Sequence, residues 1–464
     1  MKYIPTRYIV AILTAVGLAI VYGLRVNINI TMVMMVNHTI AHSNDTEGKH
    51  SICGPSLNDS DEIEQHNGEY EWSNELQGYV LSSYYWGYLV MMFPGARLCE
   101  LMSVKWMWFL AVFLNVVGCL LLPLGSDLHV GCAIAVRVLQ GLGGGISFPA
   151  TSLLLASWVP LSEKNTFASI VFSGSTLGTV FSIIITGVID IYCGWRAVFY
   201  IMGVACIPWL FLWWIFVGST PESTKFINPD EIEYILSSQG QQVGKKKKIK
   251  IIWKNIFTSM PFWALLVAHT CFNWNFYLLL TDLPIYLRKV YGATIETITI
   301  YSSIGYFSNW LFSLALGRTL DYLRKREKIN QTWAKKIANL FSTLPIALAM
   351  ICLCYSGCNE PFGATLLILS LMFYGGMWPG IMSNHVDIGP RIAATLMGMT
   401  NTPGTMSGIG VPIFVGFILG DGTDMQSWRI IFWVAVGFFA IEIFFYTFWG
   451  SGEVQNYYEE HDAE

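Results

Sequence analysis

The chain has 464 residues, of which 54% are hydrophobic and only 12% are charged, and its formal net charge at pH 7 is -4. Soluble domains carry about 25% charged residues, so most of this chain faces lipid or other helices and an ordinary soluble enzyme is excluded. The net charge itself says little, because the charges are unevenly placed, and we expect no nucleic-acid partner. The ten cysteines form no CxxC pair or other metal-ligand spacing. We therefore expect a membrane protein without a metal site or a cofactor.

Twelve runs of the sequence are long and apolar enough to cross a bilayer, which takes about 20 residues of helix. The first run contains Arg25 and is too long for a signal peptide, so we expect it to be retained as a helix. The second and the eighth runs are rich in Tyr and Ser. The sequence predicts an all-α polytopic membrane protein with helices at 8–36, 73–95, 105–125, 130–156, 165–189, 195–217, 260–285, 295–317, 336–356, 361–388, 392–420 and 428–449.

The charges of the loops predict how the chain is oriented. The loops after the sixth and eighth runs are rich in Lys and Arg, whereas residues 37–72 contain Lys49 as their only basic residue apart from His, and eight acids. Because basic loops stay in the cytoplasm, we expect both termini inside and loop 37–72 outside. Three N-glycosylation sequons in that loop agree, and they begin at Asn37, Asn44 and Asn58.

The order of these segments predicts a duplicated organisation. We expect an N-terminal six-helix half at 1–217, a cytoplasmic basic linker at 218–258, a C-terminal six-helix half at 259–449 and an acidic cytoplasmic tail at 450–464. The lysines at 245–248 and 250 serve as a topology signal in this interpretation, and anionic lipid is a second possible partner for them. Cys53 and Cys358 both fall in expected outer loops, where a disulfide between them is possible.

Two similar sequences follow the second and the eighth runs, and both resemble the loop signature G-x-x-x-D-R-x-G-R-R of the major facilitator superfamily. The second copy contains Gly317, Asp321 and Arg324. The resemblance implies that the acid caps the start of a neighbouring helix, and that the arginine pairs across the two halves and holds the outward-facing state. In the first copy Cys99 replaces the acid, which leaves either a weaker latch or one carried by Glu100.

Arg25 and Arg137 lie inside apolar runs. A charge at bilayer depth costs roughly 3 kcal/mol on insertion scales, and such residues usually have a function. Arg137 shares one helical face with Gln140 and Gly144, where its guanidinium could hold a carboxylate or a phosphate. The alternatives are that Arg137 only braces the bundle and that Arg25 extends to the interface.

Aromatic and amide side chains on the second and seventh runs are suited to a wet cavity, and they include Tyr88, Asn273 and Tyr277. Packing in the core or at the membrane interface is an equally good explanation. For coupling to an ion, the sequence offers His269, His385 and Asp387, although an intramembrane His is more often a packing residue. Glu442 lies within the twelfth run, at a peripheral position.

Several longer motifs resemble the anion/cation symporter family, solute carrier family 17, which includes sodium–phosphate cotransporters, sialin and vesicular glutamate transporters. The motifs are Arg25-Val-Asn27, Trp86-Gly-Tyr88, Arg137-Val-Leu-Gln-Gly-Leu with Phe148-Pro149-Ala, Gly194-Trp195-Arg-Ala-Val-Phe199 and Asn384-His385-Val-Asp387-Ile-Gly-Pro390-Arg391. The resemblance implies a twelve-helix major facilitator fold that transports small organic or inorganic anions, phosphate among them, by Na⁺- or H⁺-coupled symport. It implies substrate-binding roles for Arg25, Arg137, Tyr88, Phe148 and Tyr277, beside Asn273.

The sequence also departs from this family. Vesicular glutamate transporters and sialin have a Glu seven residues after the fourth-helix arginine, where this chain has Gly144, and the glutamate transporters' His and Arg positions fall on Leu81 and Phe272. These differences argue against a vesicular glutamate transporter and favour the phosphate-cotransporter-like branch.

Three functions stay open at this point: an alternating-access anion transporter, a potential-driven uniporter or channel-like carrier, and a membrane enzyme or non-transporting sensor. The third lacks support, because the sequence contains no G-x-S-x-G, HExxH or P-loop motif. We expect a monomer whose partners are a small anion and the lipid bilayer, in the plasma membrane or in an endolysosomal or vesicular membrane.

Overall fold

A computed structural model describes residues 5–36, 53, 68–224, 226–238, 247–419 and 425–462. The three sequons lie outside these residues. The first half comprises α1 (Thr6–Met35), α2 (Asn74–Leu101), α3 (Val104–Leu128), α4 (Val130–Trp158), α5 (Lys164–Phe172), α6 (Gly174–Cys193) and α7 (Trp195–Phe216). The second half comprises α10 (Met260–Tyr277), α11 (Leu283–Tyr291), α12 (Ile295–Lys325), α13 (Gln331–Cys354), α14 (Glu360–Tyr374), α15 (Ser383–Ile388), α16 (Ala393–Leu419) and α17 (Met425–Trp449).

Each of the twelve predicted runs forms helix in the structure, and the main departures are three interruptions. The fifth run is divided into α5 and α6 at Ser173, and the seventh contains a π-helical turn at Leu278–Asp282. The tenth is divided by a π-helical turn at Trp378–Met382, in which Gly380 has a non-helical ψ of -105°. Such turns often mark functional sites.

Hydropathy separates the spans into two groups. Nine described helical segments are long and apolar enough to cross a membrane on composition alone. The remaining three spans are α2, α10 with α11, and α12, and they are more polar because they carry Tyr, Asn and Thr side chains that line a central cavity. Their lower hydropathy therefore reflects their place in the bundle.

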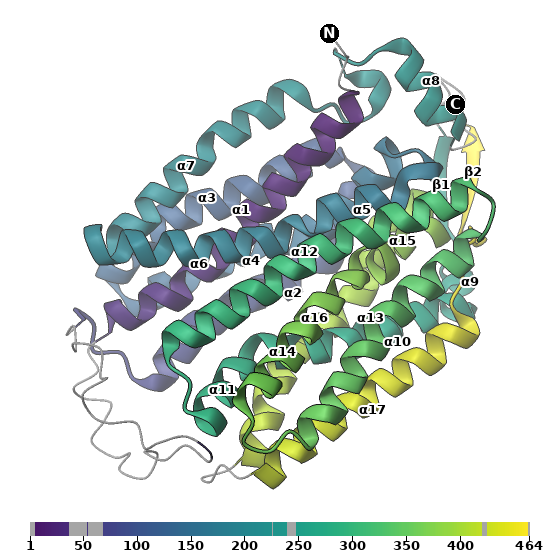
Figure 1. Cartoon of the computed structure of the whole chain (residues 1–464). Coiled ribbons are helices and arrows are strands. Elements are labelled where there is room, and N and C mark those ends of the chain that lie inside the picture. Colours follow the sequence, from purple (N-terminus) through teal and green to yellow (C-terminus); the bar gives the residue numbers. More distant parts are fainter. Residues whose placement is uncertain are drawn as a thin grey trace.

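The two sets of helices lie side by side and run along the same direction (Figure 1). Within the first set α2 and α3 pack on α4, and α1 packs on α6; within the second, α17 packs on α10 and α13, and α12 packs on α14. The sets meet where α2 contacts α16 and where α5 contacts α12. Both labelled ends of the chain lie at the same end of the bundle, near α8 (Pro229–Ser238).

Glycines allow α2 and α4 to approach closely. A Cβ atom on Gly141 would lie 2.0 Å from the carbonyl oxygen of Tyr84, and one on Gly87 would lie 2.1 Å from the carbonyl oxygen of Val138. Neither position can hold a larger residue without moving backbone. The glycines of α4 therefore fix the wall on which Arg137 lies.

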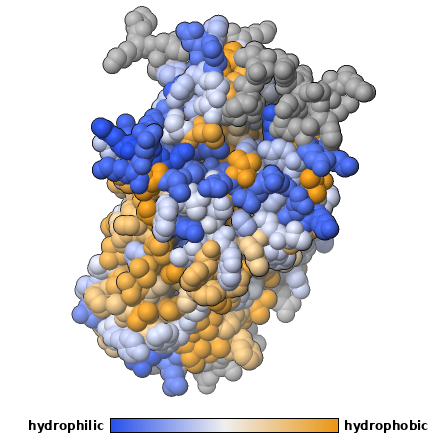
Figure 2. Space-filling view, turned by 90° about the vertical axis from the view of Figure 1, so that its right-hand side faces the viewer, coloured by the Kyte–Doolittle hydropathy of each residue, from blue (hydrophilic) through white to orange (hydrophobic). Residues whose placement is uncertain are grey.

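The end of the bundle at which α1 begins and β2 (Tyr458–Asp462) ends contains a short sheet that the sequence does not predict. We name it the cytoplasmic end, after the orientation that the loop charges predict. Strand β1 (Lys247–Ile251) of the basic linker pairs antiparallel with β2 of the acidic tail, so that Lys250 lies opposite Glu459. Opposite charges across a strand pair are favourable. Figure 2 views the molecule from this side and shows a band of hydrophilic residues above an apolar surface.

At the opposite end a disulfide joins Cys53, in the first outer loop, to Cys358, which follows α13, with 5.3 Å between their Cα atoms. The backbone amide of Cys53 donates to the carbonyl of Val290, at 2.9 Å. Nearby, Arg196 forms ion pairs of 2.7 Å with Glu69 and Asp127, and its hydrogen bond lowers the pKa of Glu69. The structure thus forms the pairing that the sequence left open.

Candidate functional site

A cavity of about 460 Å³ lies between the two halves. The six residues expected to bind substrate all line it, from α1, α2, α4 and α10: Arg25, Tyr88, Arg137, Phe148, Asn273 and Tyr277. Sequence reasoning missed much of the wall, including Tyr22, Ser175, Thr176, Thr179, Tyr306, Tyr374, Trp378, Asn401 and Thr405. The polarity of the eighth run was the one signal that could have identified Tyr306.

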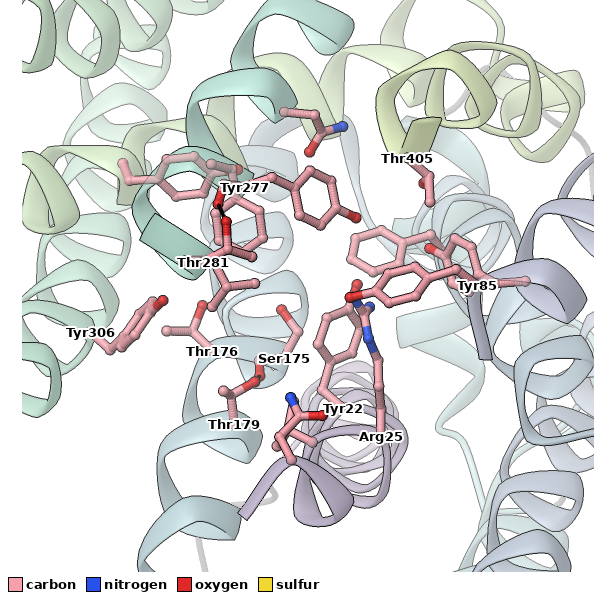
Figure 3. Close-up of a pocket in the computed structure, with 18 of the residues that line it drawn as sticks. Tyr22, Arg25, Tyr85, Ser175, Thr176, Thr179, Tyr277, Thr281, Tyr306 and Thr405 are labelled. Carbon is pink, nitrogen blue, oxygen red and sulfur yellow. Dashed lines mark hydrogen bonds between the residues drawn. The ribbon is translucent and has the colours of Figure 1, made fainter. Parts of the chain in front are cut away.

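Arg25 is the cation that faces this cavity. Its Nη2 donates to the hydroxyl of Tyr85 at 2.6 Å, and its guanidinium carbon lies 4.5 Å from the centre of the Tyr85 ring and 5.2 Å from that of Tyr22. Among the described residues no carboxylate forms an ion pair with it. Figure 3 shows the side chain extending from α1 toward Tyr85, with Tyr22 alongside. An aromatic cage therefore holds a cation that has no anionic partner among the described residues.

Arg137 is more deeply held, with only 1% of its surface exposed. Its Nη1 donates to the side-chain oxygen of Gln140 at 2.9 Å, and its Nη2 donates to the backbone carbonyl of Arg25 at 3.1 Å. Both terminal nitrogens therefore bind protein groups. Arg137 braces α4 against α1 at the point where Arg25 leaves the helix, and it adds positive charge to the cavity wall.

The cavity floor is aromatic and is made by both halves. The ring of Phe148, from α4, stacks on Phe172 and on Trp378 of the second half, with centroid distances of 5.6 Å and 6.5 Å. On the same side Asn401 Nδ2 donates to the hydroxyl of Tyr88 at 3.2 Å, which joins α16 to α2. These contacts separate the cavity from the cytoplasmic end.

Two carboxylates cap helices across the halves at the cytoplasmic end. Asp321 Oδ2, on α12, accepts from the backbone amide of Thr166 at 2.7 Å and from its hydroxyl at 2.6 Å. Glu100, on α2, accepts from the backbone amide and from the hydroxyl of Thr395, both at 2.7 Å. A carboxylate at a helix N-terminus is stabilised by the free amides and the helix dipole.

The other predicted latch residues support the Asp321 contact. Arg324 Nη1 donates to the carbonyl of Leu161 across the halves at 2.8 Å. Gly317 lets α12 approach α5, since a Cβ atom there would lie 2.3 Å from Ser169 Oγ. In both copies a carboxylate therefore caps a helix of the other half, and in the first copy that carboxylate belongs to Glu100. The role of these contacts as a latch stays a prediction.

Of the three coupling candidates, Asp387 lies in a buried ion triad that also joins the halves. Its carboxylate is 3.0 Å from Lys335 Nζ and 3.4 Å from Lys164 Nζ. Lys335 also donates to Asn165 Oδ1 at 2.6 Å. We call Lys164, Asp387 and Lys335 the ion triad; it lies on the cytoplasmic side of the cavity floor and not in the cavity.

The two histidines share one partner. Thr400 Oγ1 lies 2.9 Å from His269 Nδ1 and 2.7 Å from His385 Nε2, and the two rings are 5.5 Å apart. Both side chains are fully buried and neither lines the cavity. Their part in coupling stays a prediction.

The arrangement corresponds to one state of a two-sided carrier. The cavity is lined by the C-terminal parts of α1 and α10 and by the N-terminal half of α2, whereas the capping carboxylates and the ion triad join the halves at the other end. With the orientation that the loop charges predict, this arrangement corresponds to the outward-facing state.

Residues 14–412 match the family model for the Major Facilitator Superfamily. The chain belongs to that superfamily. Within that superfamily, the chain is 34% identical to sialin of Ovis aries over 455 residues. This match covers 97% of this chain and 90% of that sialin. It is 32% identical to a putative inorganic phosphate cotransporter of Drosophila melanogaster (99% and 87% covered) and 30% identical to vesicular glutamate transporter 2 of Homo sapiens (97% and 75%). These relatives place it in solute carrier family 17.

Solved structures agree on the fold. A proton:xylose symporter bound to 6-bromo-6-deoxy-D-glucose superposes with a TM-score of 0.69 at 13% identity, with 97% of each chain covered. A Major Facilitator Superfamily transporter in the outward conformation superposes with a TM-score of 0.62 at 13% identity, and the match covers 96% of this chain and all of that one. The protein is a multi-pass membrane transporter of small substrates, and its relatives are transporters rather than enzymes.

Proposed function

We propose that this transporter moves a small organic anion with a single negative charge and a flat apolar body from the outer side to the cytoplasm, coupled to H⁺ or Na⁺. The observation that carries the proposal is Arg25, a cation that forms no ion pair with any described carboxylate and that faces an aromatic cavity between the two halves.

The charge of the wall supports an anion with no ammonium group. Among the described residues that line the cavity, Arg25 and Arg137 are the only charged ones, and none is Asp, Glu or His. An amino-acid zwitterion would leave its ammonium group without a counter-charge in a site of low dielectric constant, which is costly. Because the terminal nitrogens of Arg137 already bind Gln140 and the carbonyl of Arg25, one guanidinium is available for one anionic group.

The rest of the wall favours an organic body over inorganic phosphate. Nine of the lining residues are aromatic: Tyr22, Tyr85, Tyr88, Phe148, Phe276, Tyr277, Tyr306, Tyr374 and Trp378. Rings of this kind stack on flat apolar groups, and the volume of about 460 Å³ is within the range of sites for small organic ligands. The hydroxyls of Ser175, Thr176 and Thr179 point into the cavity opposite Arg25 (Figure 3) and supply polar contacts at its far side.

Substrate entry is followed by rocking of the halves around the cavity. In this state the caps at Asp321 and Glu100 hold the cytoplasmic side closed. Binding of the anion between Arg25 of the first half and the aromatic residues of the second favours approach of the outer ends, and the caps then separate.

One observation favours a potential-driven uniporter as the alternative. The described cavity wall contains no side chain that gains or loses a proton near neutral pH. Exchange of labelled for unlabelled substrate without any ion gradient separates a carrier from a channel, and accumulation driven by an H⁺ or Na⁺ gradient separates a symporter from a uniporter.

The experiment uses purified protein in proteoliposomes and labelled benzoate, phosphate and glutamate as probes. We expect saturable uptake of benzoate, competition by other flat monocarboxylates, and little competition by phosphate or glutamate. A preference for phosphate or glutamate would overturn the proposal.

A further inference from the structure

We propose that Glu442, on α17, is the site that binds the coupled proton. This inference rests on the proposed function, since it assigns the proton-binding group for transport through the same cavity. The evidence is the burial of the carboxyl group, the lack of a counter-charge among the described residues, and two rows of polar side chains that lie between it and the ion triad.

The Glu442 side chain is fully buried within the second half. Its Oε1 accepts a hydrogen bond from Thr343 Oγ1 at 2.8 Å, and the neutral side-chain amide of Asn339 is a further polar neighbour. No described Lys, Arg or His forms an ion pair with it. An ionised carboxylate in such a place is very costly, so the group takes the neutral, protonated form in this outward-facing state.

The groups that face Glu442 do not supply a charge to compensate an ionised carboxylate. Cys271 of α10, Tyr374 of α14 and Tyr446 of its own helix interact with it electrostatically, and all three are neutral at physiological pH. Helix α16, which also packs on α17, contains no titratable residue. Helices α10 and α13 also pack on α17. On α10, His269 is bound to Thr400. The other titratable residues of α13 are Lys335, Lys336, Cys352 and Cys354.

One line of polar groups runs from Glu442 along α13. Thr343, Asn339 and Lys335 are spaced four residues apart, so they share one face of that helix. Asn339 and Lys335 are each 1% exposed. Thr343, which binds the carboxyl, is therefore two helical turns from Lys335 along α13, a rise of about 12 Å.

A second line runs along α17 and α15 to the acid of the same triad. Tyr446 lies one turn after Glu442, and its hydroxyl accepts a hydrogen bond from Asn384 Nδ2 at 2.8 Å. Asn384 precedes Asp387 by three residues on α15. On the other side, Tyr374 interacts with Glu442 and also lines the cavity. Glu442 therefore lies between the cavity wall and the contact that joins the halves.

This position gives protonation a consequence. A proton taken from water on the outer side neutralises Glu442 while the ion triad is closed. When the halves separate at the cytoplasmic end, Lys335 loses Asn165 and water reaches the triad. The carboxylate can then be solvated and attracted by Lys335, so the proton leaves to the cytoplasm. The proton and the anion thus bind in different places and move in one cycle.

Glu442→Gln tests the inference, because it copies the neutral acid and cannot release a proton. Two assays are compared in proteoliposomes with labelled benzoate: accumulation driven by an acidic exterior, and exchange without a gradient. We expect driven accumulation to fall by roughly tenfold or more and exchange to stay within about twofold of wild type, since exchange needs no net proton movement. Asp190→Asn is the matched control, as Asp190 is also a buried acid but lies on α6 of the other half.

Each result bears on the proposal. The proposal would be overturned if Glu442→Gln still accumulated benzoate with the pH dependence of the wild type. It would also be overturned if this variant eluted as a folded protein but had lost both driven accumulation and exchange. Loss of driven accumulation in Asp190→Asn as well would also overturn it, because the effect would then not be specific to Glu442. A wild-type protein that does not transport benzoate in either assay would instead contradict the proposed function. An infrared carboxylic-acid band that Glu442→Gln removes checks the protonated state independently of transport.

Discussion

Glu100 accepts two hydrogen bonds from Thr395, one from the backbone amide and one from the hydroxyl, both at 2.7 Å. The two residues lie in different halves, on α2 and at the start of α16. Asp321 makes the equivalent contacts with Thr166 at the start of α5. In the second copy of the motif Asp321 follows Gly317 by four residues, whereas in the first copy Glu100 follows Gly95 by five. The same capping contact is therefore made from two different positions of the motif.

Glu100→Ala should weaken the closed cytoplasmic side. Hydrogen bonds to a charged group contribute about 1.5 to 3 kcal/mol. We therefore expect the outward-facing state to be destabilised by about 2 kcal/mol relative to the inward-facing state, which lowers the ratio of outward-facing to inward-facing protein roughly 30-fold. A cysteine introduced at Ser169, which the contact with Gly317 buries, should then react faster with a thiol reagent added from the cytoplasmic side.

Cys99→Asp is the control for that prediction. Cys99 is buried in the apolar core, so an acid there should not restore slow labelling to Glu100→Ala. Restoration would show that the position of the motif, rather than the contact with Thr395, determines the latch.

Arg25 and Arg137 should give different kinetic defects. Arg25→Lys loses the planar fork that holds a carboxylate through two hydrogen bonds, so we expect KM to rise by roughly tenfold with the maximal rate nearly unchanged. Arg137→Gln leaves Gln140 and the carbonyl of Arg25 without their donor, which costs about 1 to 3 kcal/mol, and it should lower the thermal stability of the protein.

Uptake kinetics and thermal unfolding of both variants check this division. Tyr85→Phe is the matched control, because it removes only the hydrogen bond to Arg25 and should raise KM by less than Arg25→Lys does. Equal KM effects with no loss of stability in Arg137→Gln would contradict the bracing role.

Gly144 occupies the position at which the family resemblance places a Glu in sialin and the vesicular glutamate transporters, and any side chain there requires the Tyr84 ring to move. A Cβ atom there would lie 2.1 Å from the hydroxyl oxygen of Tyr84. We expect Gly144→Ala to lower stability by about 1 to 3 kcal/mol through overpacking. Gly187→Ala on α6 is the control, because no atom lies within 4 Å of the added Cβ. Melting temperatures of detergent-solubilised protein would contradict the prediction if both variants matched the wild type.

The disulfide between Cys53 and Cys358 ties the first outer loop to the second half. Oxidising conditions outside the cytoplasm maintain such bonds. A protease site inserted after Gly68 should therefore yield fragments that stay together without reductant and separate with it. Cys358→Ser should release the fragments in both conditions, and separation of wild-type fragments without reductant would show that the bond does not form.

Much of the fold follows from the sequence because apolar length and loop charge are local properties. They suffice to locate the twelve spans, and the polarity of α2 and α12 already indicates an interior position. The strand pair between Lys247–Ile251 and Tyr458–Asp462 could not be predicted, since each strand is only five residues long and the two segments are distant in sequence.

The candidate site was predictable only in part. A charge inside an apolar run is visible in sequence, so Arg25 and Arg137 could be identified, but their different roles depend on which groups their nitrogens reach in space. Thr176 and Thr405 look like ordinary helix residues until the halves come together around the cavity. Glu442 is visible as a charge, yet the lack of a counter-charge among the described residues and the row of polar side chains between it and Lys335 appear only when α13 packs on α17.

The most direct measurement is the uptake of labelled benzoate into proteoliposomes by the wild type, by Arg25→Gln and by Arg326→Gln, a control that neutralises an exposed arginine at the cytoplasmic end of α12. We predict saturable uptake by the wild type and by Arg326→Gln, and a loss of roughly tenfold or more in Arg25→Gln, because the buried anion then has no guanidinium to bind. Uptake by Arg25→Gln at the wild-type rate and KM would contradict the central claim that Arg25 binds the transported anion.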